Sequence, residues 1–205
     1  MSNFTKNELK TLKRLATPAK VQDFLNRIQF NFERKGDTLM SPRRVLRERK
    51  AHCIEGALLA ATAFWLHGQK PLLLDLKTTS DDYEHVVALF RAHGRWGAVS
   101  KTNHAVLRYR EPVYRNIHEL AMSYFHEYFL DNGKKTLRSY SDPFDLSKLR
   151  SKSWITSEKE LWSISNALDR APHHRILTPA QIETLRKAEQ IEREAGKIVE
   201  WKKSK

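Results

Sequence analysis

Cys53 is the one cysteine of this 205-residue chain, and its setting suits covalent chemistry. Apolar residues follow it and predict a helix from Cys53 to Leu66. A thiol in the first turn lies near the positive end of the helix dipole and near unbonded backbone N–H groups, which favour the thiolate. Arg49 and Lys50 act in the same direction. A lone cysteine is more often a small buried apolar residue, but this position favours a nucleophile.

A thiol nucleophile needs an imidazole partner, and the chain has nine histidines. We select His85, which opens a predicted strand directly after the acidic loop 81–84. His93 and His104 are rivals by their position in loops. His52 is expected to point away from the thiol, because adjacent residues on a helix do not share a face.

Helix-start signals divide the first half of the chain. Thr17-Pro18 predicts a helix from Pro18 to about Arg34, and Ser41-Pro42 predicts a short one to about Arg49. The expected strands are apolar or β-rich runs at 72–76, 85–90 and 96–99, and a further helix is expected over 117–129. The fold class predicted is α+β, with N-terminal helices packed on a small antiparallel sheet.

The predicted organisation has three parts. Residues 1–16 form a frayed basic lead-in, 17–131 form the core, and 132–205 form a mostly helical C-terminal extension packed on it. Helices are predicted over 158–168 and, from the Thr178-Pro179 start signal, to about Trp201.

The segment from Thr17 to Ser100 resembles the transglutaminase-like superfamily, which has the papain-type cysteine enzyme fold. The motifs that carry the resemblance are Cys53-x-Glu55-Gly56-Ala57, the Gly68 turn, the strand through Leu76, His85-Val86-Val87, and Trp96 after Gly94. The resemblance implies that the Cys53 thiolate attacks an amide or ester carbonyl while the Cys53 N–H binds the oxyanion. It also implies that His85 protonates the leaving amine, and that neither a metal nor an organic cofactor is used.

The third catalytic member departs from that pattern. In the family an aspartate follows the hairpin tryptophan by four residues and orients the histidine, and Ser100 occupies that position here. Ser100 is the positional match, but it offers only a neutral hydrogen bond. The alternatives are Asn103, a charge from Asp81 or Asp82, or a degenerate site.

Three further residues are candidates for the substrate cleft, namely Trp96, Lys101 and His52. Trp96 is also expected in the hairpin core. The basic segment 100–115 either lines a cleft for acidic substrates or forms an exposed connection. Glu55 is expected to be a first-turn acid that stabilises the helix dipole.

The composition of the chain argues against several other classes of protein. One cysteine excludes an internal disulfide and any zinc site with two thiolates. The net charge of +13 raises the question of nucleic acid, but the basic residues are interleaved and no zinc-finger, RNA-binding or phosphate-loop motif occurs. Apolar runs fall short of the roughly 20 residues that cross a bilayer, and the first 15 residues lack a secretory signal, so we expect a cytoplasmic protein without a membrane partner.

The sequence is therefore compatible with two functions. The first is cysteine-dependent hydrolysis or acyl transfer on a peptide or protein amide, by a peptidase, an amidase or a transglutaminase-like enzyme. The alternative is a binding module that kept the fold and lost catalysis, with a basic surface for an acidic protein or nucleic acid.

Overall fold

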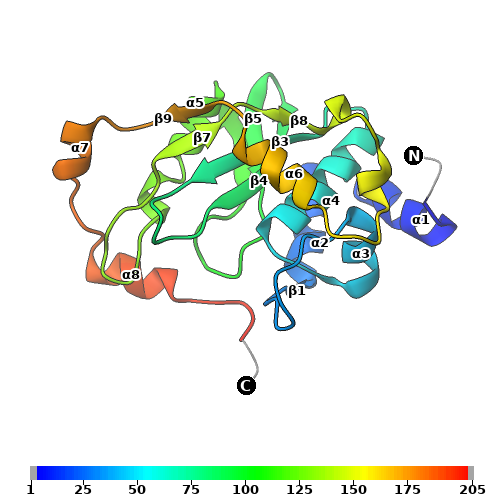
Figure 1. The fold of residues 1–205 in the computed structure, drawn as a ribbon, viewed down its shortest axis with the longest axis horizontal. Coiled ribbons are helices and arrows are strands. Elements are labelled where there is room, and N and C mark those ends of the chain that lie inside the picture. The colour runs from blue at the N-terminus through cyan, green and yellow to red at the C-terminus, as the bar shows by residue number, and fades with distance from the viewer. Residues whose placement is uncertain (1–3, 203–205) are drawn as a thin grey trace.

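A computed structural model describes residues 4–202, and Figure 1 shows an antiparallel sheet with helices on both faces. The sheet order is β6-β5-β4-β3-β7-β9, and β8 also pairs with β3. Its strands are β3 (Leu72–Lys77), β4 (His85–Ala92), β5 (Arg95–Val99), β6 (Arg110–Tyr114), β7 (Ser139–Ser141), β8 (Phe144–Asp145) and β9 (His173–Arg175). The predicted α+β class is confirmed.

Four helices and one small parallel ladder make up the N-terminal part. They are α1 (Lys6–Arg14), α2 (Pro18–Arg27), α3 (Pro42–Glu48), α4 (Cys53–Leu66) and the pair β1 (Gln29–Phe30) and β2 (Lys50–Ala51). The Thr17 and Ser41 side chains cap α2 and α3 as predicted, and α4 has its predicted bounds. In the described part of the chain, even this apolar 14-residue helix is too short to cross a membrane.

The sheet separates two apolar cores. Side chains alternate along β4, so that Val86 and Ala88 pack in the core on the α4 side while Val87 and Leu89 pack on the opposite face. The opposite core is closed by α5 (Ile117–Met122) and the 3-10 turn η1 (Phe125–Glu127), where a single helix over 117–129 was expected. This burial on both faces fixes the register of β4 and hence the position of its first residue, His85.

The helix that was expected to reach Arg34 ends at Arg27. The buried ammonium of Lys101 donates to the carbonyl oxygens of Leu25 and Ile28, at 2.8 and 2.7 Å. The segment that follows α2 then pairs as β1 with β2 instead of forming another helical turn. A cation bound at the last carbonyls is a favourable way to end a helix.

Residues 1–16 are not a frayed lead-in over their described part. Thr5 and Glu8 close a capping box at the start of α1, and Leu12 on that helix is fully buried. The helix is amphipathic, so its burial against the N-terminal core holds it in place.

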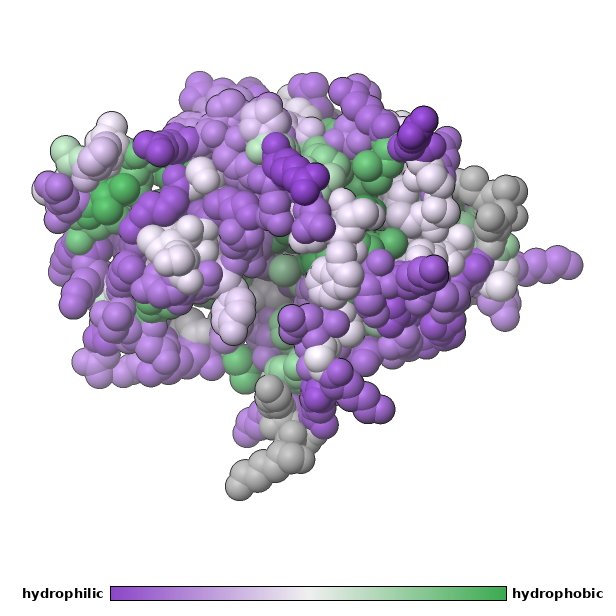
Figure 2. Space-filling view, viewed as in Figure 1, coloured by the Kyte–Doolittle hydropathy of each residue, from purple (hydrophilic) through white to green (hydrophobic). Residues whose placement is uncertain are grey.

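The extension 132–205 is not mostly helical, because β7, β8 and β9 belong to the main sheet. Its other elements are η2 (Leu146–Lys148), η3 (Ser153–Ile155), α6 (Trp162–Asp169), α7 (Pro179–Glu183) and α8 (Gln190–Gly196). The predicted long helix is broken between α7 and α8, where the Ala188 N–H donates to the Gly133 carbonyl at 2.9 Å. Figure 2 shows a mostly hydrophilic face with an apolar patch near α7, which lies away from the main body.

Candidate active site

Cys53 is the first residue of α4, and its location follows from the way that helix begins. The ladder strand β2 ends at Ala51, and His52 is the extended N-cap residue, with φ −97° and ψ −170°. The Glu55 carboxylate accepts the His52 N–H at 2.9 Å and closes the first turn. The thiol therefore lies among the unbonded N–H groups of the helix start, as predicted.

His85 and Ser100 come together at the end of the sheet next to α4. His85 Nε2 lies 2.7 Å from Ser100 Oγ, and Ser100 Oγ lies 2.5 Å from the Leu107 carbonyl oxygen. A carbonyl only accepts, so the Ser100 hydroxyl donates to Leu107 and accepts the N–H of His85 Nε2. This polarity leaves Nδ1 of His85 as the ring nitrogen available to the thiol.

The backbone of Ser100 is fixed by a side chain from α2. Gln22 accepts the Ser100 N–H at 3.0 Å and donates to the Ser100 carbonyl at 2.8 Å. Both Gln22 and Ser100 are buried. This two-bond clamp holds the hydroxyl at a constant distance from His85, and the sequence alone did not indicate it.

A second set of contacts supports Leu107 behind Ser100. Leu107 adopts a left-handed backbone with φ 60°, and its N–H donates to Glu127 at 2.6 Å. Glu127 is in turn paired with Arg110 at 2.7 Å. A left-handed leucine is a strained conformation that persists only where its surroundings impose it. Here it turns the carbonyl toward Ser100.

His52 contacts the thiol, contrary to the sequence-based expectation. Its Nδ1 lies 4.0 Å from Cys53 Sγ, while Nε2 donates to the Thr38 carbonyl at 2.9 Å. The expectation failed because His52 is the extended N-cap residue and does not follow helical geometry. Glu55 Oε1 lies 3.4 Å from the same Nε2 and favours the imidazolium.

The two histidines make the thiol acidic. Burial by itself raises the pKa of Cys53, but hydrogen bonds to His52 and His85 and their positive charge outweigh it, so the pKa lies well below its ordinary value. Burial likewise opposes the charge on His52, but the thiolate, Glu55 and the Thr38 carbonyl raise the pKa of His52 to about 10. The thiol thus ionises at lower pH than an ordinary cysteine, and it does so beside an imidazole that is charged at neutral pH.

Glu55 does more than stabilise the helix dipole. Its side chain is fully buried, and each carboxylate oxygen accepts two or more hydrogen bonds. The donors are Asn31 Nδ2 at 3.1 Å, Thr38 Oγ1 at 2.8 Å, the Met40 N–H at 2.9 Å and the His52 N–H at 2.9 Å. The carboxylate therefore joins the segment 31–40 to the start of α4.

The three alternative orienting residues, Asn103, Asp82 and Asp81, make their side-chain hydrogen bonds and ion pairs with residues other than His85. The Asn103 side chain donates to the Trp201 carbonyl at 3.0 Å and accepts its N–H at 2.9 Å. Asp82 accepts hydrogen bonds from the Thr136 hydroxyl and the Tyr83 N–H. Asp81 is paired with Lys134 at 2.8 Å. Ser100 is the residue that meets His85.

Of the three cleft candidates, His52 and Lys101 line the cavity at the thiol, and Trp96 does not. Trp96 packs with the core on the α5 face and lies under the guanidinium of Arg91, 5.1 Å from the ring centre. Lys101 lines the cavity, but its ammonium donates to the Leu25 and Ile28 carbonyls at the end of α2. Neither places a polar group at the thiol, whereas His52 does.

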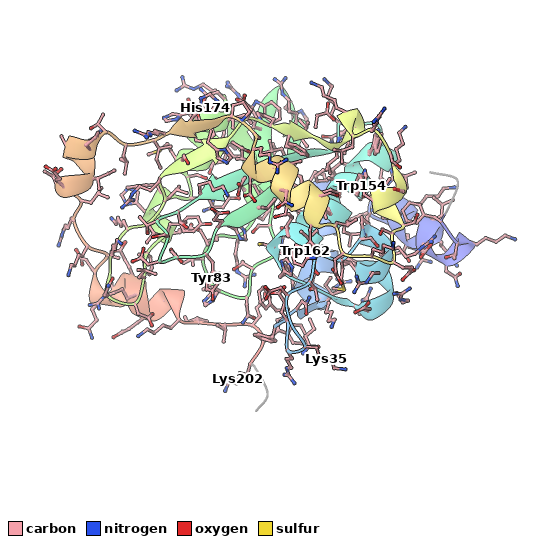
Figure 3. All side chains as sticks on the ribbon, in the orientation of Figure 1. Lys35, Tyr83, Trp154, Trp162, His174 and Lys202 are labelled. Carbon is pink, nitrogen blue, oxygen red and sulfur yellow. The ribbon has the colours of Figure 1, made fainter. Side chains whose placement is uncertain are left out.

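Cys53, His52 and His85 open into one cavity of about 910 Å³. Figure 3 shows Tyr83, one of its lining residues, on the loop that leads into β4. Carboxylates in the wall are Glu33, Asp82, Glu84, Glu127 and Asp131. Basic residues line it too, namely Lys101, His104, Arg193 and Lys197. Segment 100–115 thus reaches the cavity through its first half, whereas Arg108, Arg110 and Arg115 lie outside the lining and are paired with Glu200, Glu127 and Glu119.

One group of carboxylates has the spacing of a metal site in the described part of the chain. It consists of Asp75, Glu84 and Asp169. The ammonium of Lys77 lies among them, at 3.4, 2.5 and 2.5 Å from their oxygens. The Lys77 ammonium thus occupies the position between the three carboxylates where a metal ion would lie, and it offsets part of their charge.

The chain matches none of the known protein-family models, and no curated protein matches it either. The assignment of the site therefore depends on its geometry and chemistry.

Proposed function

We propose that this chain is a cysteine-dependent enzyme that cleaves or transfers the acyl group of a peptide or protein amide. The observation that carries the proposal is the hydrogen-bond chain from Leu107 through Ser100 to His85, which leaves His85 Nδ1 free to exchange a proton beside Cys53. Nucleophilic acyl transfer requires an activated thiol, an oriented base and a cavity that admits the substrate. An inert buried cysteine would need none of them.

The proposed reaction assigns a separate task to each group. The Cys53 thiolate attacks the carbonyl carbon, and His52 keeps that thiolate stable while the cavity is empty. When attack begins, His85 carries a proton on Nδ1 as well as on Nε2. It gives the Nδ1 proton to the nitrogen of the leaving amine as the C–N bond breaks, so that neutral His85 and an acyl-thioester remain. Water or an amine, deprotonated by His85, then attacks the thioester and releases the thiolate.

We also propose a transglutaminase-like, papain-type core for residues 17–100. Support comes from the packing of α4, which begins at the nucleophile, against an antiparallel sheet in which β4 carries the histidine and β5 leads to its orienting residue. In this proposal the family's aspartate is replaced by a hydroxyl that has its own acceptor.

The test is the pH dependence of alkylation. We expect iodoacetamide to label Cys53 at a rate that is constant down to pH 7 and falls only at lower pH, because the thiolate persists until the pH drops through its lowered pKa. Peptide mass mapping after timed labelling measures the rate, with Cys53→Ala as background. A rate that rises through an ordinary thiol pKa of about 8.5 would disprove the proposal.

Ser100→Ala is expected to slow acylation of Cys53 about tenfold, because it removes the acceptor that holds the His85 tautomer. The measurement is single-turnover acylation by an acyl 4-nitroanilide, whose leaving amine takes its proton from His85. Ser141→Ala is the matched control, since Ser141 is a fully buried serine whose hydroxyl accepts the Asp75 N–H at 3.0 Å. Equal rates in wild type and Ser100→Ala would contradict this role.

A further inference from the structure

Tyr128 has a buried hydroxyl for which the described residues supply no hydrogen-bond partner. Its side chain is 2% exposed, and it lines the cavity into which Cys53 and His85 open. Tyr128 follows η1, after the segment 17–100 that resembles the superfamily, and no sequence motif indicated it.

An unpartnered buried hydroxyl is unfavourable for folding, because it has lost its hydrogen bonds to water without replacement. Nearby Tyr124 shows the ordinary solution: it is also fully buried, and its hydroxyl donates to the Arg108 carbonyl at 3.2 Å. A phenylalanine would fill the space of Tyr128 without the unsatisfied group. The hydroxyl is therefore best explained by a ligand that enters the cavity.

The hydroxyl is available as a donor. Burial raises the pKa of Tyr128 well above its ordinary value, and the negative charges of Cys53 and Asp82 act in the same direction. The phenol therefore stays protonated at neutral pH. A protonated phenol that lines the same cavity as the nucleophile can donate to the oxygen that becomes negative during attack.

We propose that the Tyr128 hydroxyl donates a hydrogen bond to the carbonyl oxygen of the amide that Cys53 attacks, together with the backbone N–H of Cys53. This inference rests on the proposed function. As the S–C bond forms, the π-electron pair of the carbonyl moves to its oxygen, and Tyr128 stabilises that charge while keeping its own proton. The C=O bond re-forms as the C–N bond breaks, and the proton on the leaving amine comes from His85.

The test compares two reactions of the same thiol in Tyr128→Phe. Acylation by 4-nitrophenyl acetate passes through an oxyanion, whereas alkylation by iodoacetamide does not. We expect acylation of Cys53 to fall about 10²-fold, while alkylation stays within about twofold of wild type. Tyr124→Phe is the control, because it deletes a hydroxyl of the same core that already has an acceptor, and both of its rates should match wild type.

Each other outcome has a definite meaning. Unchanged acylation in Tyr128→Phe contradicts the inference, and an equal loss in both reactions shows that Tyr128 acts on the thiolate, which also contradicts it. A Tyr128→Phe protein with a lowered melting temperature, or one that does not fold, would show that the hydroxyl has a structural partner. If Cys53 of the wild-type protein were acylated no faster than a free thiol in solution, that result would contradict the proposed function itself.

Discussion

His85→Ala is expected to lower the acylation of Cys53 by about 10²- to 10⁴-fold, the usual contribution of a general acid–base residue. Alkylation at neutral pH should be reduced much less, because His52 remains 4.0 Å from the sulfur and still stabilises the thiolate. The structure thus separates two tasks that a simple cysteine–histidine pair would combine. Single-turnover acylation by an acyl 4-nitroanilide, whose leaving amine needs a proton, measures the first task, and iodoacetamide labelling of the same protein measures the second.

The matched control for this change is His93→Asn, at the far end of β4 from the cavity. His93 lies in the turn with φ 50°, a conformation that asparagine tolerates, so the fold should be retained. Neither rate should change in that variant. An alkylation rate in His85→Ala that falls as far as the acylation rate would show that His85 alone activates the thiol.

The core around Cys53 could be predicted because its signals are local. Caps at Thr17 and Ser41 and the apolar residues after Cys53 set helix starts through contacts within one turn of the chain. The alternation of β4 and the turn before β5 placed His85 and Ser100 relative to each other. Local patterns indicated Cys53 and His85, whereas Ser100 was indicated by the resemblance to the superfamily.

The remaining features depend on contacts between distant segments. The end of α2 is set by Lys101, more than 70 residues away, and the break after α7 involves Gly133. Strands β7 and β9 are three residues long and have little pattern of their own, so pairing with the sheet decides their conformation. Sequence periodicity carries no information about such partners.

Ser100 illustrates how a departure from a family pattern is resolved by structure. From sequence, a serine in the aspartate position indicated a weaker site. In the fold, Ser100 Oγ lies 2.5 Å from the Leu107 carbonyl, where an ionised carboxylate would place two acceptors against each other. A hydroxyl fits this position because it donates to Leu107 and accepts from His85 at the same time. The serine is thus consistent with an oriented histidine.

Glu55→Ala is expected to have the largest effect on stability. It leaves the donors of Asn31, Thr38, Met40 and His52 buried without their common acceptor. Removing one member of a buried, hydrogen-bonded charge cluster costs about 3–5 kcal/mol, which for a domain of this size lowers the melting temperature by about 10 °C. Thermal denaturation followed by circular dichroism measures it.

The same substitution should also weaken the thiolate, because His52 loses the carboxylate 3.4 Å from its Nε2. Where the protein remains folded, we expect iodoacetamide labelling at neutral pH to fall relative to wild type. Glu55→Gln keeps the shape of the side chain but not its charge, and it turns an amide N–H₂ toward donors. Its melting temperature and labelling rate should therefore lie between those of wild type and Glu55→Ala.

Glu158→Ala is the control. That carboxylate is exposed and pairs with exposed Arg47, so its removal should change neither the melting temperature nor the labelling rate. A Glu55→Ala protein as stable as wild type would mean that the donors around this carboxylate find water instead, and that the start of α4 is held by its apolar packing alone.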